Sequence, residues 1–339
     1  MGGRRWVVWL ESAWDAARLR SAASRTPVDV RIEPYIGHGA DGGVVVRGRV
    51  LDDPTPGGPV EGEGLGAAAR RTLRHFLTDE LPGVPLRVVV GGASVETVTD
   101  AEGYFQVRLR PDFDQLTTPW SSGTVELAGE YRGFMESIST PLEVMVPGPE
   151  ARFGIVSDVD DTILQTGVQR IGRMISQTVT GSALTRTPFP GASELYRDLA
   201  AGLNPVFYVS SSPWNLHSFL VGFLRHQRFP TGPVLLRDLL GTSAGQEEKS
   251  GRIQEILDLH PQLRFVLVGD SGEKDPETYA GVVRANPERI IAVYIREVRL
   301  DPGDGRVEKI SGAWSGDVPF VLAADSDGVR QHAHELGLL

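Results

Sequence analysis

The sequence predicts two folding units: a small β-sandwich, and after it an α/β domain in which a parallel sheet lies between two layers of helices. A chain of 339 residues is long enough for two domains. Residues 28–149 show short strand patterns separated by turn residues. From residue 150 to 339, near-continuous apolar strands alternate with helical segments, which is typical of a parallel sheet covered on both faces.

The first segment, residues 1–27, is predicted to hold an amphipathic helix. Trp6, Leu10 and Trp14 follow helical spacing, and arginines occupy other positions. A helix of this kind can lie on a membrane surface, or it can dock on its own protein, which is the commoner use of an apolar stripe. Glu11 cuts the apolar run too short for a signal peptide.

The β-rich segment shows the pattern of an antiparallel sandwich with an inserted helix. A turn over residues 100–103 joins two strands as a hairpin. We see no catalytic constellation in this half, and we expect its isolated histidines, His38 and His75, at the surface or in turns. The predicted strands are 44–50, 86–90, 94–99, 104–109, 124–130 and 142–146, with the helix over 65–78.

The second half begins after a boundary at Pro147-Gly148-Pro149. Ligands of open parallel sheets bind beyond the carboxyl ends of the strands, so the chemistry is expected where these strands end. The predicted strands are 153–157, 204–209, 233–236, 264–268 and 289–294, and the predicted helices are 192–201, 214–226, 246–259 and 276–286.

The first of these strands runs into the sequence Asp158-Val-Asp160-Asp-Thr162. On an extended chain, Asp158 and Asp160 point to the same side, and carboxylates that close repel one another unless a cation lies between them. Their ligand atoms are all oxygen, which suits Mg²⁺ and not zinc. The alternative is a strand that ends in an aspartate-rich turn.

The other strand ends carry groups that suit a phosphate. The second strand ends in Ser210, Ser211 and Ser212, whose hydroxyls and amides lead into a helix. Lys249 lies near the start of the helix after the third strand, and Gly269-Asp270 with Asp275 follows the fourth. Each group alone could be a helix cap or a solvated charge. Their arrival in order on successive strand ends favours one common site.

This ordered set resembles the haloacid dehalogenase (HAD) superfamily of phosphotransferases. The stretches 157–163, 210–215 and 267–277 look like one branch of it, the actin-patch phosphatidate phosphatases and their bacterial relatives, distant cousins of the lipins. The resemblance covers roughly residues 150–339, with weaker likeness in 31–37 and 44–53. It implies a HAD-like phosphatase domain, and it indicates the substrate less specifically than the superfamily because one fold hosts many substrates.

The resemblance also implies roles. Asp158 attacks phosphorus and forms an aspartyl-phosphate, and Asp160 protonates the leaving group and then activates water. Mg²⁺ is held by Asp158, Asp270 and the backbone carbonyl of Asp160. Ser210 and the amide of Ser211 hold a phosphoryl oxygen, and Lys249 offsets the shared negative charge. Supporting residues are Thr162, which fixes the loop, and Asp275, which orients the metal shell.

The insert 165–190 is too short for a full cap domain, so we expect an open site with at most a flap. An open site suits a large substrate, because small-metabolite phosphatases often need a lid to exclude water.

We therefore expect a Mg²⁺-dependent phosphatase of lipid metabolism that acts on phosphatidate or a similar monoester in the cytoplasm, with peripheral membrane contact as an option. The alternatives are a phosphatase of a soluble metabolite or phosphoprotein, and a catalytically inert module that binds a lipid or a partner. The net charge of −10 argues against nucleic acid as a partner. No run of 18 apolar residues is present, so no transmembrane segment is expected. There is no cysteine, which excludes thiolate metal sites and cysteine nucleophiles.

Overall fold

The computed structural model describes residues 26–52, 79–159, 163, 190–237, 245–271, 274–297, 314 and 316–339. Five predictions from the sequence lie outside these residues: the N-terminal helix, the helix over 65–78, the position of His75, the insert over 165–190 except its last residue, and the surroundings of Asp160 and Thr162.

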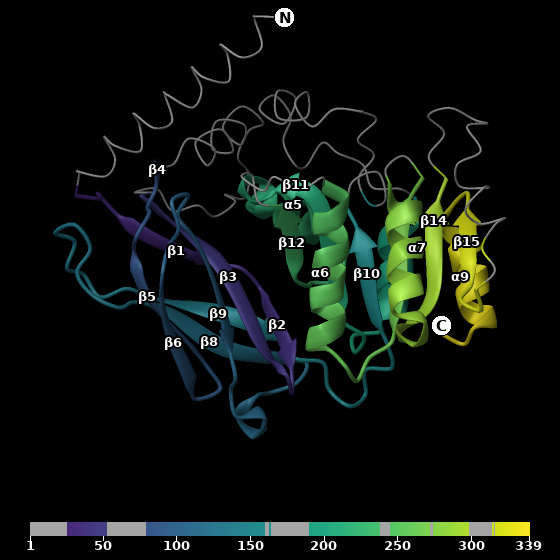
Figure 1. Cartoon of the computed structure of the whole chain (residues 1–339), viewed down its shortest axis with the longest axis horizontal. Helices are drawn as coiled ribbons and strands as arrows, with labels where there is room; N and C mark the ends of the chain where they lie inside the picture. Colours follow the sequence, from purple (N-terminus) through teal and green to yellow (C-terminus); the bar gives the residue numbers. More distant parts are fainter. Residues whose placement is uncertain are drawn as a thin grey trace, which may run out of the picture.

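The first part of the chain forms one mostly antiparallel sheet that folds over its own apolar core (Figure 1). The long strand β3 (Gly43–Asp52) pairs with four other strands, which lets the sheet turn back on itself. Alternate residues of β5 and β7 are buried, the pattern of strands with one face on a core. The other strands are β1 (Val30–Pro34), β2 (Gly37–Ala40), β4 (Asp79–Glu80), β5 (Pro85–Val90), β6 (Ala93–Val98), β7 (Tyr104–Leu109), β8 (Trp120–Leu127) and β9 (Ser139–Met145), with a short 3₁₀ helix η1 (Phe113–Gln115).

The second part forms a six-stranded sheet, in which all neighbours are parallel and the order is β12-β11-β10-β13-β14-β15. All residues of β10 and β13 are buried, as expected for central strands covered on both faces. This confirms the α/β fold class. The strands are β10 (Gly154–Asp158), β11 (Val206–Pro213), β12 (Val234–Arg237), β13 (Phe265–Asp270), β14 (Ile290–Arg296) and β15 (Phe320–Ala323).

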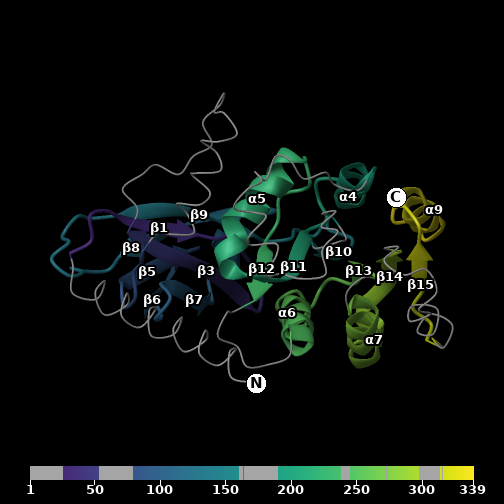
Figure 2. The same ribbon diagram turned by 90° about the horizontal axis from the view of Figure 1, so that it is seen from above.

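Helices cover both faces of this sheet and make a three-layer arrangement (Figure 2). The helices α4 (Ala192–Ala200), α5 (His217–His226) and α9 (Ser326–Glu335) share one apolar core with one face of the sheet. The helices α6 (Gly245–Leu259) and α7 (Asp275–Ala285) pack on the other face. Two short 3₁₀ helices, η3 (Trp214–Leu216) and η4 (Pro287–Arg289), complete the described elements.

Three details differ from the sequence-based expectation. Strand β11 continues to Pro213, so the three serines lie in the strand itself and not in the cap of a helix. The strands β1, β2, β4 and β15 and the helix α9 were not predicted. His38 was expected at the surface or in a turn, and this expectation is wrong: it is buried in β2, with Nδ1 3.2 Å from Nε2 of His260. Burial lowers the pKa of His260 to about 3 and that of His38 well below its usual value, so the pair is neutral.

Candidate active site

Two buried aspartates stand at the carboxyl ends of neighbouring strands. Asp158 is the last residue of β10, and Asp270 is the last residue of β13. The two strands are parallel, with Ser157 opposite Val268, so both aspartates lie at the same edge of the sheet. Neither side chain is exposed. Continuous apolar strands inside the sheet therefore place two charged groups together at its end.

Lys249, in the second turn of α6, reaches this edge from the side. Its Nζ donates a hydrogen bond to Oδ1 of Asp158 at 2.7 Å and another to Oδ1 of Asp275. The ammonium also lies 5.9 Å from the ring centroid of Tyr279. A buried ammonium is costly unless it is paired, and here two carboxylates pair with it.

Asp275, the first residue of α7, holds the end of β13 in place. Its Oδ2 accepts a long hydrogen bond, 3.4 Å, from the backbone N–H of Asp270. Gly269 is required beside it, because a side chain at that position would overlap the Asp275 carboxylate and the ring of Tyr279. The Tyr279 hydroxyl donates to the carbonyl of Val268 at 3.0 Å. The sequence pattern Gly269-Asp270 with Asp275 predicted a functional strand end here, but no pattern in the sequence indicated Tyr279.

The three aspartates form a cluster that fits a metal ion. One carboxylate oxygen from each of Asp158, Asp270 and Asp275 lies within 4.8 Å of the others. Three carboxylates and one ammonium leave a formal charge of −2 at this site. The donor atoms are all oxygen, and the formal charge of the site would be balanced by a divalent cation. Both features suit a hard cation. Both oxygens of Asp275 accept hydrogen bonds, Oδ1 from Lys249 and Oδ2 from the backbone N–H of Asp270, so Asp158 and Asp270 are the better candidates for direct ligands.

Ser210 reaches the same edge of the sheet from β11. In the parallel pairing, Val209 lies opposite Asp158, so Ser210 is one residue beyond the partner of the aspartate. Its Oγ is buried and accepts a hydrogen bond from the backbone N–H of Ser212 at 2.9 Å. Ser211 is partly buried. The structure therefore brings the serines at the end of β11, Ser210–Ser212, to the same strand ends as the aspartates.

Sequence reasoning missed one feature that supports Asp158. The hydroxyl of Ser157 donates to the carbonyl of Asp158 at 2.6 Å and lies 2.5 Å from the hydroxyl of Tyr196 on α4. Burial raises the pKa of Tyr196 well above its usual value, so its hydroxyl stays protonated and donates to Ser157. This chain of hydrogen bonds fixes the backbone at Asp158. The sequence pattern gave no indication of Tyr196.

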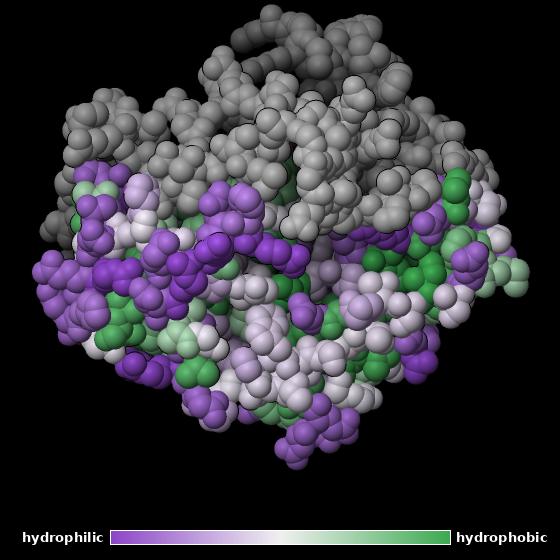
Figure 3. All heavy atoms as spheres, turned by 180° about the vertical axis from the view of Figure 1, so that it is seen from behind, coloured by the Kyte–Doolittle hydropathy of each residue, from purple (hydrophilic) through white to green (hydrophobic). Residues whose placement is uncertain are grey.

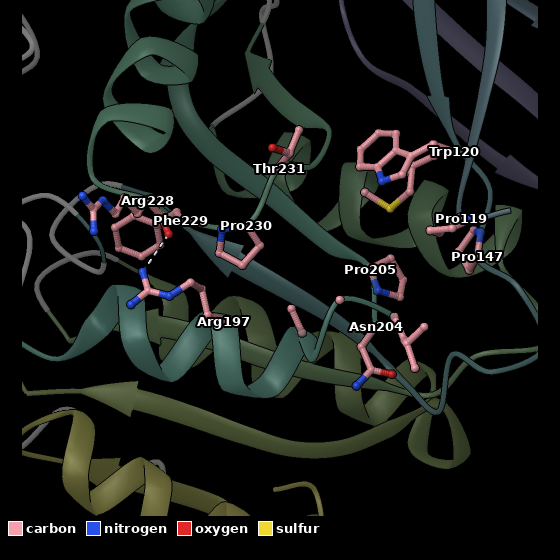
Figure 4. A pocket seen from close by; sticks show the side chains of 14 residues that line it. Pro119, Trp120, Pro147, Arg197, Asn204, Pro205, Arg228, Phe229, Pro230 and Thr231 are labelled. Atoms are coloured by element: carbon pink, nitrogen blue, oxygen red, sulfur yellow. Dashed lines mark hydrogen bonds between the residues drawn. The ribbon is translucent and has the colours of Figure 1, made fainter.

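A pocket of about 560 Å³ lies elsewhere, between the two sheets (Figure 4). Its lining includes Asn204 and Pro205, which precede β11, so it is at the opposite end of the strands from the aspartates. Among the residues that the structure describes, no carboxylate lines it. Arg197 donates to the backbone carbonyl of Arg228, just past the end of α5. The C-termini of α4 and α5 point toward this region and carry partial negative charge, which disfavours an anion there. The pocket is not part of the aspartate site.

Comparison with known proteins agrees with the motifs. Residues 153–297 match the family model described as phosphatidate phosphatase APP1, catalytic domain. Phosphatidate phosphatase APP1 of Saccharomyces cerevisiae is 29% identical over 240 residues, which cover 66% of this chain and 40% of the yeast protein. An uncharacterized protein of Schizosaccharomyces pombe is 31% identical over 154 residues, covering 43% of this chain and 25% of that protein. The chain thus aligns with less than half the length of these relatives.

Solved structures show more distant likeness. A HAD family hydrolase from Deinococcus radiodurans, with bound phosphate and sodium, is 16% identical and has a TM-score of 0.35, covering 56% of this chain and 99% of that one. The class C acid phosphatase from Bacillus anthracis is 16% identical with a TM-score of 0.30, covering 55% and 80%. The family match lies on the segment that carries Asp158, Ser210, Lys249 and Asp270. Residues 153–297 of this chain are therefore similar to the catalytic domain of phosphatidate phosphatase APP1.

Proposed function

We propose that this protein is a Mg²⁺-dependent phosphomonoester hydrolase that uses Asp158 as its nucleophile. The observation that carries this proposal is the buried contact between Asp158 and Lys249 inside a cluster of three aspartates. A phosphate monoester is a dianion and repels an anionic nucleophile unless cationic groups neutralise the site. Here Lys249 supplies one positive charge, and the oxygen cluster suits a bound cation.

In the proposed reaction, an oxygen of Asp158 attacks phosphorus and the bond to the leaving oxygen breaks. Asp160, two residues later, gives a proton to that oxygen and then takes one from the water that hydrolyses the aspartyl-phosphate. Lys249 stabilises the negative charge shared by Asp158 and the phosphoryl group. Ser210 and the amide of Ser211 bind a phosphoryl oxygen.

Asp158, Asp270 and the backbone carbonyl of Asp160 would hold Mg²⁺, and Asp275 would orient this shell through its contacts with Lys249 and the Asp270 amide. When bound, the ion supplies charge neutralisation for the phosphate and the nucleophile. Ca²⁺ is expected to be a poor substitute, because it takes more oxygen ligands at longer distances than Mg²⁺ does.

The proposed substrate class is a phospholipid monoester such as phosphatidate. The support is the family match, because the relative from Saccharomyces cerevisiae is named a phosphatidate phosphatase. The competing candidates remain a soluble phosphate ester, a phosphoprotein, and an inert binding module. The residues that would be lost in an inert relative, namely Asp158, Ser210, Lys249 and Asp270, are all present.

The test is a screen of phosphate monoesters that includes phosphatidate in mixed micelles, nitrophenyl phosphate, a sugar phosphate and a phosphopeptide. We expect phosphate release with Mg²⁺, none with excess EDTA, and the highest kcat/KM on the lipid. A higher kcat/KM on a soluble ester would reject the lipid substrate. Full activity in EDTA would reject the metal requirement, and no release from any ester would favour the binding module.

We also propose that the protein works in the cytoplasm and touches membranes only at their surface. Among the described residues, no helix is long and apolar enough to cross a membrane. On the face shown in Figure 3, hydrophilic and hydrophobic described residues are interspersed. The support for surface contact is the pattern of Trp6, Leu10, Trp14 and nearby arginines in residues 1–27.

Vesicle co-sedimentation at low salt tests this contact for the full chain and for a chain that lacks residues 1–24. We expect weak, salt-sensitive binding by the full chain that the deletion reduces, with activity on nitrophenyl phosphate retained. Equal binding by both chains, with a lower melting temperature for the shorter one, would show that the segment docks on the protein instead. No binding by the full chain would reject membrane contact.

A further inference from the structure

One side chain of the first sheet belongs to the core of the second domain. Tyr35 follows β1, yet its ring is buried in the apolar cluster that α4, α5 and α9 share with the parallel sheet. The ring stacks on Trp214, with centroids 5.4 Å apart and planes 8° apart, and on His217, with centroids 3.6 Å apart. Trp214 begins η3 and His217 begins α5. Tyr35 therefore packs on the turn that directly follows Ser210–Pro213, the end of β11.

The position of Tyr35 is itself fixed by the first sheet. Its backbone N–H donates to the carbonyl of Arg47 on β3 at 2.8 Å. Beside it, Glu33 binds Arg49 at 2.6 Å and accepts a hydrogen bond from Ser218 of α5 at 2.9 Å. Burial alone would raise the pKa of Glu33, but the adjacent Arg49 lowers it, so the carboxylate stays charged. The sheet thus holds the first turn of α5 by an aromatic stack and by the hydrogen bond that Ser218 donates to the Glu33 carboxylate.

A second side chain of the first sheet is buried in the second domain, but far from Ser210–Pro213. Met145, at the end of β9, is buried in the other core, the one that α6 and α7 share with the sheet. Met145 lines the pocket of Figure 4 together with Asn204 and Pro205, which directly precede β11. Ser210 lies toward the opposite, carboxyl end of β11. Tyr35 and Met145 therefore both join the domains, but only Tyr35 contacts the segment that continues from Ser210.

We propose that Tyr35 is a positioning residue, through which the β-rich domain holds Ser210–Pro213 in place for binding a phosphoryl oxygen. The inference concerns the role of the first domain, and its catalytic consequence rests on the proposed phosphatase activity. Pro213 and Trp214 link the serines to the stack with no intervening flexible segment. Movement of Trp214 and His217 would move the amides and hydroxyls at the end of β11.

The test compares three variants in the full chain. Tyr35→Leu removes the stack, and Tyr35→Phe keeps it and removes only a hydroxyl that is buried without a hydrogen-bond partner among the described residues. Met145→Ala is the matched control, because it also removes a buried contact between the domains. Each variant is measured for kcat and KM on nitrophenyl phosphate with Mg²⁺, for its melting temperature, and for amide hydrogen exchange at residues 210–217.

We expect Tyr35→Leu to lower kcat by at least tenfold while the protein remains folded at the assay temperature, and to speed exchange at residues 210–217. Tyr35→Phe should match the wild type. Met145→Ala should lower the melting temperature but keep kcat within about twofold, since its contact is remote from Ser210. The proposal is overturned if Tyr35→Leu keeps the wild-type kcat and the wild-type exchange rate. It is also overturned if Met145→Ala lowers kcat and speeds exchange as much as Tyr35→Leu does. If the wild type hydrolyses no ester, the proposed activity fails, and the exchange data alone decide whether Tyr35 holds the loop.

Discussion

The contacts of Lys249 lead to a prediction about stability that needs no knowledge of the substrate. Lys249 is 3% exposed, and its ammonium binds both Asp158 and Asp275. Lys249→Met keeps most of the volume of the side chain and removes the charge. The variant then holds three buried carboxylates with no protein cation among these contacts.

The expected loss is large. Removing one partner of a buried ion pair costs about 3–5 kcal/mol because the remaining charge is left uncompensated. Coulomb's law gives a similar size, about 4 kcal/mol for unit charges about 4 Å apart at an effective dielectric constant of about 20. We therefore expect the free energy of unfolding in EDTA to fall by about 3–5 kcal/mol.

Urea unfolding of the wild type, Lys249→Met and the control Lys274→Met, each in EDTA and in Mg²⁺, measures this effect. Lys274 is an exposed lysine at the start of α7, and its replacement is expected to change stability by less than about 0.5 kcal/mol. Mg²⁺ should stabilise Lys249→Met more than the wild type, because the ion then replaces the missing charge. A loss below about 1 kcal/mol in Lys249→Met, or equal stabilisation of both proteins by Mg²⁺, would refute this electrostatic account of the site.

Three further predictions concern Asp160, Asp270 and His217. Asp160→Asn should nearly abolish hydrolysis of an alkyl phosphate but reduce that of nitrophenyl phosphate less, since nitrophenolate leaves without a proton; equal losses in steady-state rates would argue against an acid at this position. Asp270→Ala should raise the Mg²⁺ concentration for half-maximal activity at least tenfold, and an unchanged Mg²⁺ titration would remove Asp270 from the metal shell. Burial lowers the pKa of His217 from 6.5 to about 3. The unfolded chain therefore takes up this proton first as the pH falls, and stability is lost between about pH 6.5 and 3 by up to about 1.4 kcal/mol per pH unit. His217→Gln should remove this part of the slope in urea unfolding between pH 7 and 5, and an unchanged slope would contradict the assignment.

Much of the parallel-sheet domain was predictable because most residues of the strands from β10 to β14 are buried and apolar, and helical segments alternate with them. In such a sheet, residues that follow different strands converge on one edge, which is why distant positions such as Asp158, Lys249 and Asp270 could be placed together. The exception was the C-terminal pair, β15 and α9. Three of the four residues of β15 are only partly buried, so the strand lacks the apolar run that marked the others.

Contacts between the domains could not be predicted from the sequence. Tyr35 directly follows the five-residue strand β1, and His38 lies in the four-residue strand β2. Local periodicity carries little information over segments this short. Their partners, Trp214 and His260, are far away in the chain. Tyr196 was missed for a similar reason, because its hydroxyl acts through Ser157, a partner on another element.

The central claim is that Asp158 is the nucleophile, and the most direct measurement is the Mg²⁺-dependent rate of Asp158→Asn on nitrophenyl phosphate beside that of the wild type. The change is nearly isosteric and removes the attacking charge. Circular dichroism and a melt of the variant confirm that it is folded. We expect the rate to fall by at least 1,000-fold, about 4 kcal/mol of barrier. A rate within tenfold of the wild type, about 1.4 kcal/mol, would contradict a mechanism through an aspartyl-phosphate at Asp158.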